Sequence, residues 1–566
     1  MRLVFSAPHF AYFRNFESVL EALAADGHQI HLAADEAETF GGHALVARLA
    51  ASCPCVTYGR VPSAGGESWM PFAQKVRYAL DYARFRARRY ADVPKLRVRS
   101  AERAPRVVRW LTEGVGAVGL VRRTLQWLER SLPRSVAMRS WLEQLAPDAV
   151  ILTSLTFSRS SAIEQLKAAR GLGIPVGAAI MSWDHLSSKA PLHIAPDMTL
   201  VWNEVQKHEA VDMHALPPDS VVVTGAQCYD QWFERQPSRT REAFCRDVGL
   251  DPSRPFILYV CSAMSPVPTP VEPEFVREWV TALRRSDAAR LRETGVLIRP
   301  HPERLKEWVN VRLDGIDNVV VQGATPIDAS SKADYFDALT HCSAVVGLCT
   351  SAFLEAAIAG RPVLTLLLPE YRMHQDGMAH FRYLLNVEGG LLHTAHDLAA
   401  HLRDLSDVLA RSRERDERNK RFLTAFVRPH GLDTAATPAF VAAVEQLARM
   451  PRTVDSRFAG ATAAQSFVGW LANRTHSGIG EWLMMDAVDM ARARSEEHNE
   501  ERKRDIQETR ALYYAHKARA RQEHARAREH TQRLKEWAKW RRGLSARKQF
   551  ARLKGGLKQL VGSSQR

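Results

Sequence analysis

Short runs of apolar residues, each followed by a helical repeat of apolar positions, recur along the first 450 residues. An apolar run at residues 2–6 precedes a helical repeat at 15–25, and a second run follows at 30–33. The alternation returns at residues 149–152 and at 256–260. Strands buried in a parallel sheet are apolar throughout, and the helices between them cover the sheet. The pattern therefore predicts an α/β protein built from two doubly wound halves.

Residues 343–368 form the clearest unit, an apolar strand, a hydroxyl-bearing loop, a helix and a second apolar strand. The loop carries Thr350 and Ser351, and Gly360 ends the helix. A helix N-terminus offers unpaired N–H groups that suit a phosphate. Glu355 lies one turn into the helix, where a ribose hydroxyl would need an acceptor. The alternative is an ordinary strand–helix–strand unit whose hydroxyl loop only caps the helix.

Polar residues also follow two strands of the first half. His9 comes directly after the first strand, and the loop at residues 182–189 carries Trp183, Asp184 and His185. Open α/β sheets bind ligands at the carboxyl ends of their strands. These positions make His9, Asp184 and His185 candidate catalytic groups, with solvated loop side chains as the alternative.

The second half has a comparable turn after the apolar run at 295–298. Two prolines there flank Arg299 and His301 and restrict the backbone around them. Arg299 is suited to pairing a phosphate, and His301 to donating a hydrogen bond to developing phosphate charge. The alternative is a rigid turn with solvated polar tips. A later polar loop, residues 369–380, carries Gln375.

Charge is unevenly distributed along the 566 residues, whose formal net charge is +15. Residues 501–566 hold 20 Lys and Arg against 6 Asp and Glu, and residues 81–134 hold 14 against 5. The remainder is therefore acidic, and the two basic stretches predict a surface partner and no specific nucleic acid. Residues 544–561 alternate apolar and basic positions at helical spacing, which suits an anionic membrane; a solvated helix is the alternative.

Helical patterns at about residues 70–145 interrupt the alternation and predict a helical insertion. Arginines mark one face, and an apolar face predicted to pack on the sheet comprises Val107, Val108, Trp110, Leu111, Val121, Leu125, Trp127 and Leu128. The arginine face leaves room for a membrane-facing surface. Residues 234–255 are polar and contain three prolines, which predicts a linker between the halves.

The chain begins on a strand pattern without a signal peptide, and charges or prolines interrupt every long apolar run. Its seven cysteines are scattered, and no pattern suits a metal site. These features predict a cytoplasmic protein, peripheral at the inner face of the cell membrane if its basic tail binds lipid.

Five segments, in order, carry a family resemblance: SAPHF (6–10), SWDHLSSKA (182–190), VVVTGAQCYDQWF (221–233), IRPHP (298–302) and GLCTSAFLEAAIAGRPVL (347–364). Together they resemble two-domain nucleotide-dependent transferases of the GT-B fold. Within that fold they are most similar to the bacterial CDP-glycerol glycerophosphotransferase and capsule-type glycosyltransferase group. Two departures leave glycerol phosphate chemistry and the acceptor open: the family's Trp-His-Gly is Trp183-Asp184-His185, and its Pro-Arg is Gln227-Cys228.

The resemblance implies an acceptor domain at residues 1–233, a nucleotide-donor domain at 254–430 and a helix crossing back at 431–450. Residues 455–566 lie outside the resemblance, and their composition predicts a basic helical extension. The resemblance also implies that Thr350 and Ser351 hold the donor diphosphate and that Glu355 holds the ribose. His9 matches the catalytic histidine of UDP-sugar transferases, with Asp184 or His185 as rivals. Arg299 and His301 would offset phosphate charge, and Gln375 faintly matches an acidic-Gln pair after the donor helix.

The resulting hypothesis is transfer of a sugar, or a polyol phosphate, from a nucleotide-activated donor to a hydroxyl acceptor. The donor would be a nucleotide-sugar or CDP-polyol, and the acceptor a glycan or lipid-linked chain of cell-surface polysaccharide or glycolipid synthesis. No cofactor or metal is expected. The alternatives are a nucleotide-sugar 2-epimerase, which shares the fold, and a non-catalytic scaffold whose basic tail binds a membrane or partner.

Overall fold

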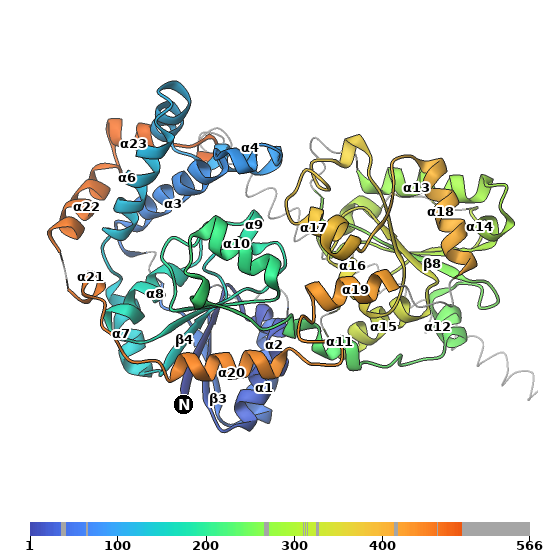
Figure 1. Ribbon diagram of the computed structural model, residues 1–566, viewed down its shortest axis with the longest axis horizontal. Helices are drawn as coiled ribbons and strands as arrows, with labels where there is room; N and C mark the ends of the chain where they lie inside the picture. The colour runs from blue at the N-terminus through green and yellow to red at the C-terminus, as the bar shows by residue number, and fades with distance from the viewer. Residues whose placement is uncertain are drawn as a thin grey trace, which may run out of the picture. The chain divides into compact units, whose positions relative to one another are not determined.

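Two parallel β-sheets, each flanked by helices, form the body of the molecule in the computed structural model (Figure 1). The structure describes residues 1–35, 41–63, 66–264, 271–309, 311, 313, 315–323, 326, 328–411, 417–460 and 462–489. Residues 1–489 cluster as one compact unit. The predicted membrane-binding helix at residues 544–561 lies outside the described residues. Among the described helices, none has the length and apolar character needed to cross a membrane.

The first sheet has the strand order β3-β2-β1-β4-β5-β6-β7, and all its neighbouring strands pair in parallel. Its strands are β1 (Arg2–Ala7), β2 (Gln29–Ala34), β3 (Val56–Arg60), β4 (Ala149–Leu152), β5 (Val176–Ala179), β6 (Met198–Val201) and β7 (Val221–Val223). The strand order reverses direction between β1 and β4, which is where doubly wound sheets bind ligands. This register places the loops after β1 and β4 side by side, because Ser6 pairs with Leu152.

The second sheet has the order β10-β9-β8-β11-β12-β13, also parallel throughout. Its strands are β8 (Phe256–Val260), β9 (Gly295–Arg299), β10 (Val319–Val321), β11 (Ala344–Gly347), β12 (Val363–Leu366) and β13 (His393–Ala395). The central strands β8, β9, β11 and β12 are buried at every residue, as their continuous apolar runs predict. Together the two sheets confirm the predicted architecture of two Rossmann-like halves.

Helices cover both sheets, and those that matter below fall into three groups. The first sheet carries α1 (Glu17–Ala25), α2 (Gly42–Ser52), α8 (Ala162–Gly171), α9 (His185–Ser188) and α10 (Glu204–His214). The short α11 (Asp230–Glu234) follows β7 and packs Trp232 against Tyr335 and Phe336 of the second half. The second carries α12 (Arg241–Val248), α13 (Glu272–Arg285), α14 (Ala289–Glu293), α15 (Ala329–His341), α16 (Ala352–Ile358), α17 (Phe381–Asn386), α18 (Leu398–Ala410) and α19 (Glu417–Phe426). The closing helices are α20 (Thr437–Ala448), α21 (Ser456–Ala459), α22 (Ala463–Arg474) and α23 (Gly478–Met484).

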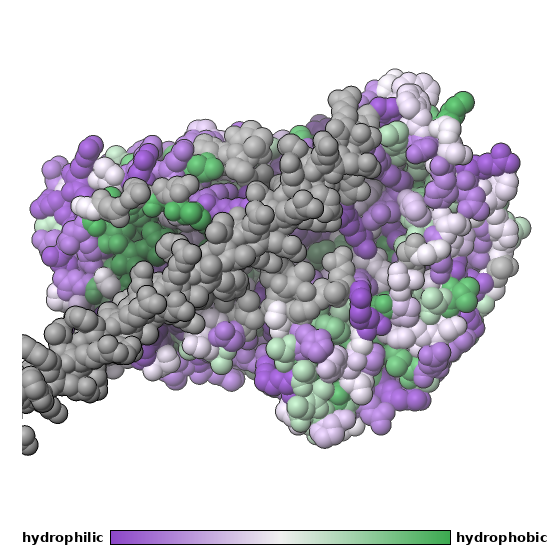
Figure 2. Space-filling view, turned by 180° about the vertical axis from the view of Figure 1, so that it is seen from behind, coloured by the Kyte–Doolittle hydropathy of each residue, from purple (hydrophilic) through white to green (hydrophobic). Residues whose placement is uncertain are grey.

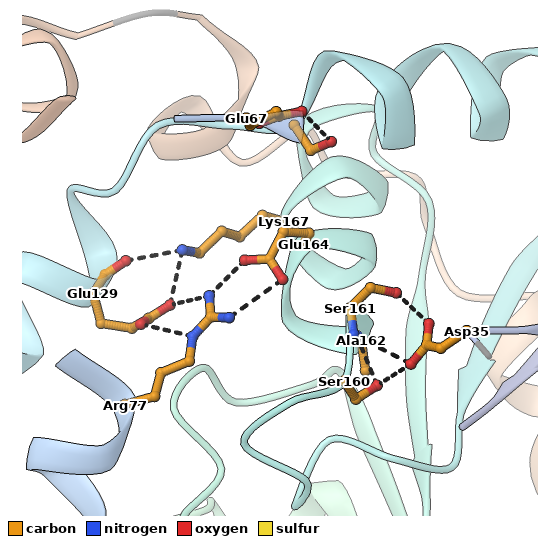
Figure 3. A network of polar contacts seen from close by, with 10 residues as sticks. Asp35, Glu67, Arg77, Glu129, Ser160, Ser161, Ala162, Glu164 and Lys167 are labelled. Carbon is orange, nitrogen blue, oxygen red and sulfur yellow. Dashed lines mark hydrogen bonds and ion pairs between the residues drawn. The ribbon is translucent and has the colours of Figure 1, made fainter. Parts of the chain in front are cut away.

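The helical insertion between β3 and β4 is attached to the first sheet by a buried ionic network (Figure 3). The insertion comprises α3 (Met70–Phe85), α4 (Pro94–Arg103), α5 (Arg106–Arg109), the π-helix η4 (Trp110–Gly114), α6 (Val118–Arg130) and α7 (Val136–Leu145). Arg77 of α3 pairs with Glu129 of α6 and Glu164 of α8, at 3.0 and 2.5 Å. Lys167 of α8 lies 2.9 Å from the same Glu129 carboxylate, and all four side chains are almost fully buried.

Two tryptophans of the insertion are placed differently from the prediction. Trp110 and Trp127 were expected on the packed apolar face, but they are 65% and 47% exposed. Val108, Val121 and Leu125 do fill the core of the insertion. The helical spacing identified the buried stripe correctly, and the two tryptophans lie outside it.

The segment at residues 234–255 is not a bare linker, because it contains α12. Phe244, Cys245 and Val248 of this helix are buried in the core of the second half. Arg239, just before it, pairs with Asp334 at 2.8 Å and Asp337 at 3.1 Å. The proline-rich composition hid an amphipathic helix that belongs to the second sheet.

After the second half, the chain returns to the first sheet through α20, which lies along that sheet in Figure 1. Phe440, Val444 and Leu447 of α20 are buried in the core of the first half. Asp230 accepts hydrogen bonds from the backbone N–H groups of Ala436 and Thr437, which lie at the start of α20. This contact gives the aspartate of the TGAQCYD segment a structural role, because it anchors the returning chain.

Candidate functional site

Loops from the carboxyl ends of both sheets meet at one place. Trp183, after β5, packs edge-on against the ring of His380 from the second half, with centroids 4.9 Å apart. Tyr383 of α17 donates a hydrogen bond to Glu209 of α10. Lys95, at the start of α4, lies 2.7 Å from Nδ1 of His374. The insertion and both sheets therefore contribute residues to a single region, which we call the strand-end site.

His9 and His185 lie at the two ends of one row of aromatic rings. The ring of His9 contacts that of Tyr12 at 4.3 Å, and Tyr12 contacts Phe157 at 6.2 Å. Phe157 in turn contacts His185 edge-on at 5.2 Å. The row brings together two histidines that are far apart in the sequence. His9 is half-buried and directly precedes the 3-10 helix η1 (Phe10–Asn15) that follows β1, whereas His185 is buried.

Asp184 is held as a carboxylate. Its oxygens accept hydrogen bonds from Ser182 at 2.6 Å and Ser188 at 3.1 Å, and Nζ of Lys189 lies 3.6 Å away. Burial alone raises the pKa of Asp184, but Lys189 and the Ser182 hydroxyl outweigh it and hold the pKa well below its usual range. Asp184 is therefore a poor proton acceptor and a suitable electrostatic partner for a neighbouring base.

His185 and His380 face Asp184 from different halves of the molecule. Burial lowers the pKa of each histidine to about 4, although the Asp184 carboxylate acts in the opposite direction on both. Both rings are therefore neutral at pH 7. His380 lies in a loop that the sequence marked only as polar, so its place beside Asp184 was missed.

Buried hydrogen bonds hold the hydroxyl loop after β11 in place. The N–H of Cys349 donates to the Ser262 hydroxyl at 3.0 Å, and the amide nitrogen of Gln375 donates to the Leu348 carbonyl at 3.0 Å. Ser351 is exposed and Thr350 is half-buried. Gln375 is fully buried, and its amide nitrogen also donates to Leu366. These contacts make Gln375 a support of the loop, so any role in donor binding would be one of positioning.

Glu355, one turn into α16, is hydrogen-bonded to Tyr335 of α15. The Tyr335 hydroxyl donates to it at 2.6 Å. Burial raises the pKa of Glu355 to about 7, against the lowering effects of that hydrogen bond and of Arg14. Arg14 lies in the 3-10 helix η1 (Phe10–Asn15) after β1, so a cation of the first half already acts on this carboxylate.

Arg299 and His301 both have contacts within the protein itself. Arg299 pairs with Asp334 at 3.0 Å and lies over the Tyr335 ring at 5.0 Å, so a phosphate would have to compete with Asp334. Nδ1 of His301 accepts a hydrogen bond from the backbone N–H of Glu303 at 3.2 Å. This contact assigns the ring proton to Nε2, and burial lowers the His301 pKa. His301 is thus a neutral donor, as its proposed role requires.

Lys95 is the residue that sequence reasoning missed most clearly. Burial lowers its pKa, and Arg99, Lys189 and Arg304 lower it further. Burial raises the pKa of the Cys349 thiol to about 12, and Lys95 acts on it in the opposite direction, so the two groups interact electrostatically. Cations gathered beside hydroxyl and backbone donors are suited to a polyanion. No local pattern marked Lys95, because α4 reaches the site only through the packing of the insertion.

One group of possible metal ligands occurs among the described residues, and it lies elsewhere. Oxygen and nitrogen atoms of Asp26, His28 and Glu445 come within 4.8 Å of one another. His28 contacts Glu445 at 2.9 Å and the N-terminal amine at 3.3 Å. The group sits before β2, away from the strand-end site, and we assign it a structural role.

No protein-family model matches the sequence, and no curated protein does. Solved structures match at 10–12% identity. The UDP-GlcNAc 2-epimerase from Neisseria meningitidis, bound to UDP-GlcNAc, has a TM-score of 0.45 at 12% identity, covering 79% of this chain and 100% of its own. A glycosyltransferase from Rickettsia africae has a TM-score of 0.45 at 10% identity, covering 79% and 98%. Anabaena Alr3699/HepE, in complex with UDP and glucose, has a TM-score of 0.42 at 10% identity, covering 80% and 100%. Similarities this distant assign no activity to the chain.

Proposed function

We propose that the protein is an enzyme that binds a nucleoside-diphosphate sugar at the strand-end site and transfers the sugar to a hydroxyl acceptor. The observation that carries this proposal is the position of Lys95, whose ammonium lies 2.7 Å from Nδ1 of His374; the neighbouring Gln375 hydrogen-bonds the Leu348 carbonyl at the start of the Thr350–Ser351 loop. Among the neighbouring cations, Lys189 pairs with Asp184 and Arg304 with Glu307, and a bound diphosphate would supply an anionic partner to Lys95. Glu355, one turn into α16, supplies the acceptor that a ribose hydroxyl needs.

The reaction would form a bond between the acceptor oxygen and the sugar carbon and break the bond from that carbon to the diphosphate oxygen. We assign the base to His9, which takes the acceptor proton. His185 is buried and weakly basic, and Asp184 is held ionised. Nε2 of His301 and the ammonium of Lys95 would stabilise the charge that grows on the leaving diphosphate, an effect that supplies several kcal/mol in such sites.

The proposal is tested by incubating the protein with UDP-, CDP-, GDP- and dTDP-linked sugars and analysing the products. A transferase releases nucleoside diphosphate faster when a glycan or lipid-linked acceptor is added. An epimerase instead converts the donor to a second nucleotide-sugar without any acceptor, and that result would replace transfer with the epimerase alternative. A scaffold gives no product and no change in melting temperature with any nucleotide-sugar.

Replacing Lys95 with methionine is expected to weaken donor binding by about 10- to 100-fold, because a charge-assisted contact to a diphosphate is lost. Titration calorimetry with the tightest donor measures the effect. Lys420→Met is the matched control, since Lys420 is a half-exposed lysine of α19 that pairs with Glu417. Equal affinities in wild type and Lys95→Met would remove Lys95 from the site.

Donor affinity is also expected to rise about tenfold between pH 6 and pH 8, because Glu355 must be ionised to accept from a ribose hydroxyl. With its pKa raised to about 7 by burial, the carboxyl is mostly protonated at pH 6 and mostly ionised at pH 8. Glu355→Gln should bind more weakly and lose the pH dependence. A nucleotide-sugar is the right ligand, since its diphosphate does not titrate in this range. A slope that persists in Glu355→Gln would contradict the assignment.

A further inference from the structure

Exposed apolar side chains are concentrated on the helical insertion and the helices beside it. Of the 13 large apolar residues exposed in the described part of the chain, six lie within residues 94–145 and four on α22 and α23. All four exposed tryptophans of that set are among them, namely Trp110, Trp127, Trp470 and Trp482. Single exposed apolar residues are normal, whereas such a concentration marks an interaction surface.

The outer end of the insertion is a helical hairpin whose turn is apolar. Trp110, Val115 and Leu120 are 65%, 60% and 69% exposed, and they surround the turn between η4 and α6. In Figure 1 this turn projects beyond the neighbouring helices. Figure 2 shows the molecule from behind, where apolar side chains are interspersed with polar ones at several places on the visible face. We call residues 109–123 the insertion tip.

Helix α6, which begins within the tip, carries positive charge on its exposed side, and the one acidic residue of the tip, Glu113, pairs with Arg109 at 3.9 Å and accepts a hydrogen bond from Tyr82. Leu120 and Trp127 lie two helical turns apart on α6, with Arg123 and Arg130 at the spacing that places them alongside. The one acidic residue of α6, Glu129, is buried in the network with Arg77. The outer face of α6 thus combines apolar and cationic groups without a carboxylate.

The neighbouring helix α23 extends this surface. Trp482 is 55% exposed and lies under the guanidinium of Arg106, 5.0 Å from its centre. The backbone N–H of Arg106 donates to the carbonyl of Met485 at 3.1 Å, which fixes α23 beside α5. Trp110 lies one turn beyond Arg106, so two exposed tryptophans flank the same arginine.

We propose that the insertion tip is a membrane-binding element that inserts Trp110, Val115 and Leu120 into the interface of an anionic lipid bilayer. Tryptophan and aliphatic side chains favour the boundary between headgroups and acyl chains, and the arginines of α6 add attraction to anionic headgroups. The tail at residues 501–566 is an unsuitable cover for this surface, because it is itself strongly basic. The proposal stands independently of sugar transfer.

Vesicle co-sedimentation of the full chain tests the proposal. Wild type should bind vesicles of phosphatidylcholine mixed with phosphatidylglycerol and bind pure phosphatidylcholine weakly. The double substitution Trp110→Ser with Leu120→Ser should weaken binding to the anionic vesicles by about tenfold. Val309→Ser is the control, because Val309 is 68% exposed on the second half and should leave binding unchanged. Melting temperatures near wild type show that the variants are folded.

A second measurement locates the contact without weakening it. Phospholipids brominated on their acyl chains should quench the tryptophan fluorescence of wild type, and Trp110→Phe should remove part of that quenching while still binding. Equal vesicle binding by wild type and the double variant would assign lipid binding to the tail and overturn the proposal. Absence of wild-type binding to either vesicle would overturn it as well and leave the surface to a protein partner.

Discussion

Substitution of His9 by alanine is expected to lower donor turnover by about 10²- to 10⁴-fold, the usual contribution of a general base. The expectation follows from the position of His9 at the carboxyl end of β1, half-buried and edge-on to Tyr12. The affinity for the nucleotide-sugar should change little, because the proposed donor contacts come from the second half and Lys95. The measurement is the release of nucleoside diphosphate at saturating donor, with acceptor present.

Two further variants make this prediction decisive. His208→Ala, which removes an exposed histidine of α10, should retain wild-type turnover. His185→Ala distinguishes the rival base, because a fall in its turnover with His9→Ala unaffected would transfer the role to the pair Asp184–His185. Wild-type turnover in both His9→Ala and His185→Ala would remove the catalytic assignment altogether.

Replacing Arg77 with methionine is expected to reduce the free energy of unfolding by about 3–5 kcal/mol, because it leaves two buried carboxylates without their shared partner. Arg77 joins Glu129 and Glu164, and so connects the insertion to α8 (Figure 3). Lys167 would remain paired with Glu129 at 2.9 Å, and Glu164 would lose the ion pair that Arg77 supplies. Urea unfolding, together with the protease sensitivity of residues 70–145, measures the loss.

The same network predicts a dependence on pH. Despite the opposing effect of burial, Arg77 and Lys167 lower the pKa of Glu129 to about 2. A depressed carboxyl pKa stabilises the folded state above the unfolded value near 4.5, and that contribution is lost as the pH falls toward 2.

Arg139→Met is the control for Arg77→Met, since the half-exposed pair of Arg139 with Glu143 should contribute about 0.5 kcal/mol or less. Equal stabilities of Arg77→Met and this control would show that the network does not hold the insertion in place.

The architecture was predictable because buried parallel strands are continuous apolar runs, which are visible without any contact information. Strands β8, β9 and β11 are examples, and a hydroxyl or imidazole side chain follows within three residues of the end of each. The segment at residues 234–255 shows where this reasoning fails. Its prolines and charges concealed α12, whose buried face needs only Phe244, Cys245 and Val248.

In the site, only the residues whose positions depend on the neighbouring sequence could be predicted. His9, Asp184 and Glu355 follow or begin elements that the sequence defines, so their placement at strand ends could be expected. Lys95 and His380 could not be found this way, because each depends on packing between segments distant in the chain. Trp110 illustrates a related limit, since helical spacing shows the buried stripe without showing how wide it is.

The most direct measurement is a crystal structure of the protein with its tightest-binding nucleotide-sugar. The diphosphate is predicted to lie against the loop of Thr350 and Ser351, within hydrogen-bonding reach of the Lys95 ammonium, with Glu355 on the ribose. A donor bound with its diphosphate away from that loop would contradict the account, as would failure of every UDP-, CDP-, GDP- and dTDP-linked sugar to bind.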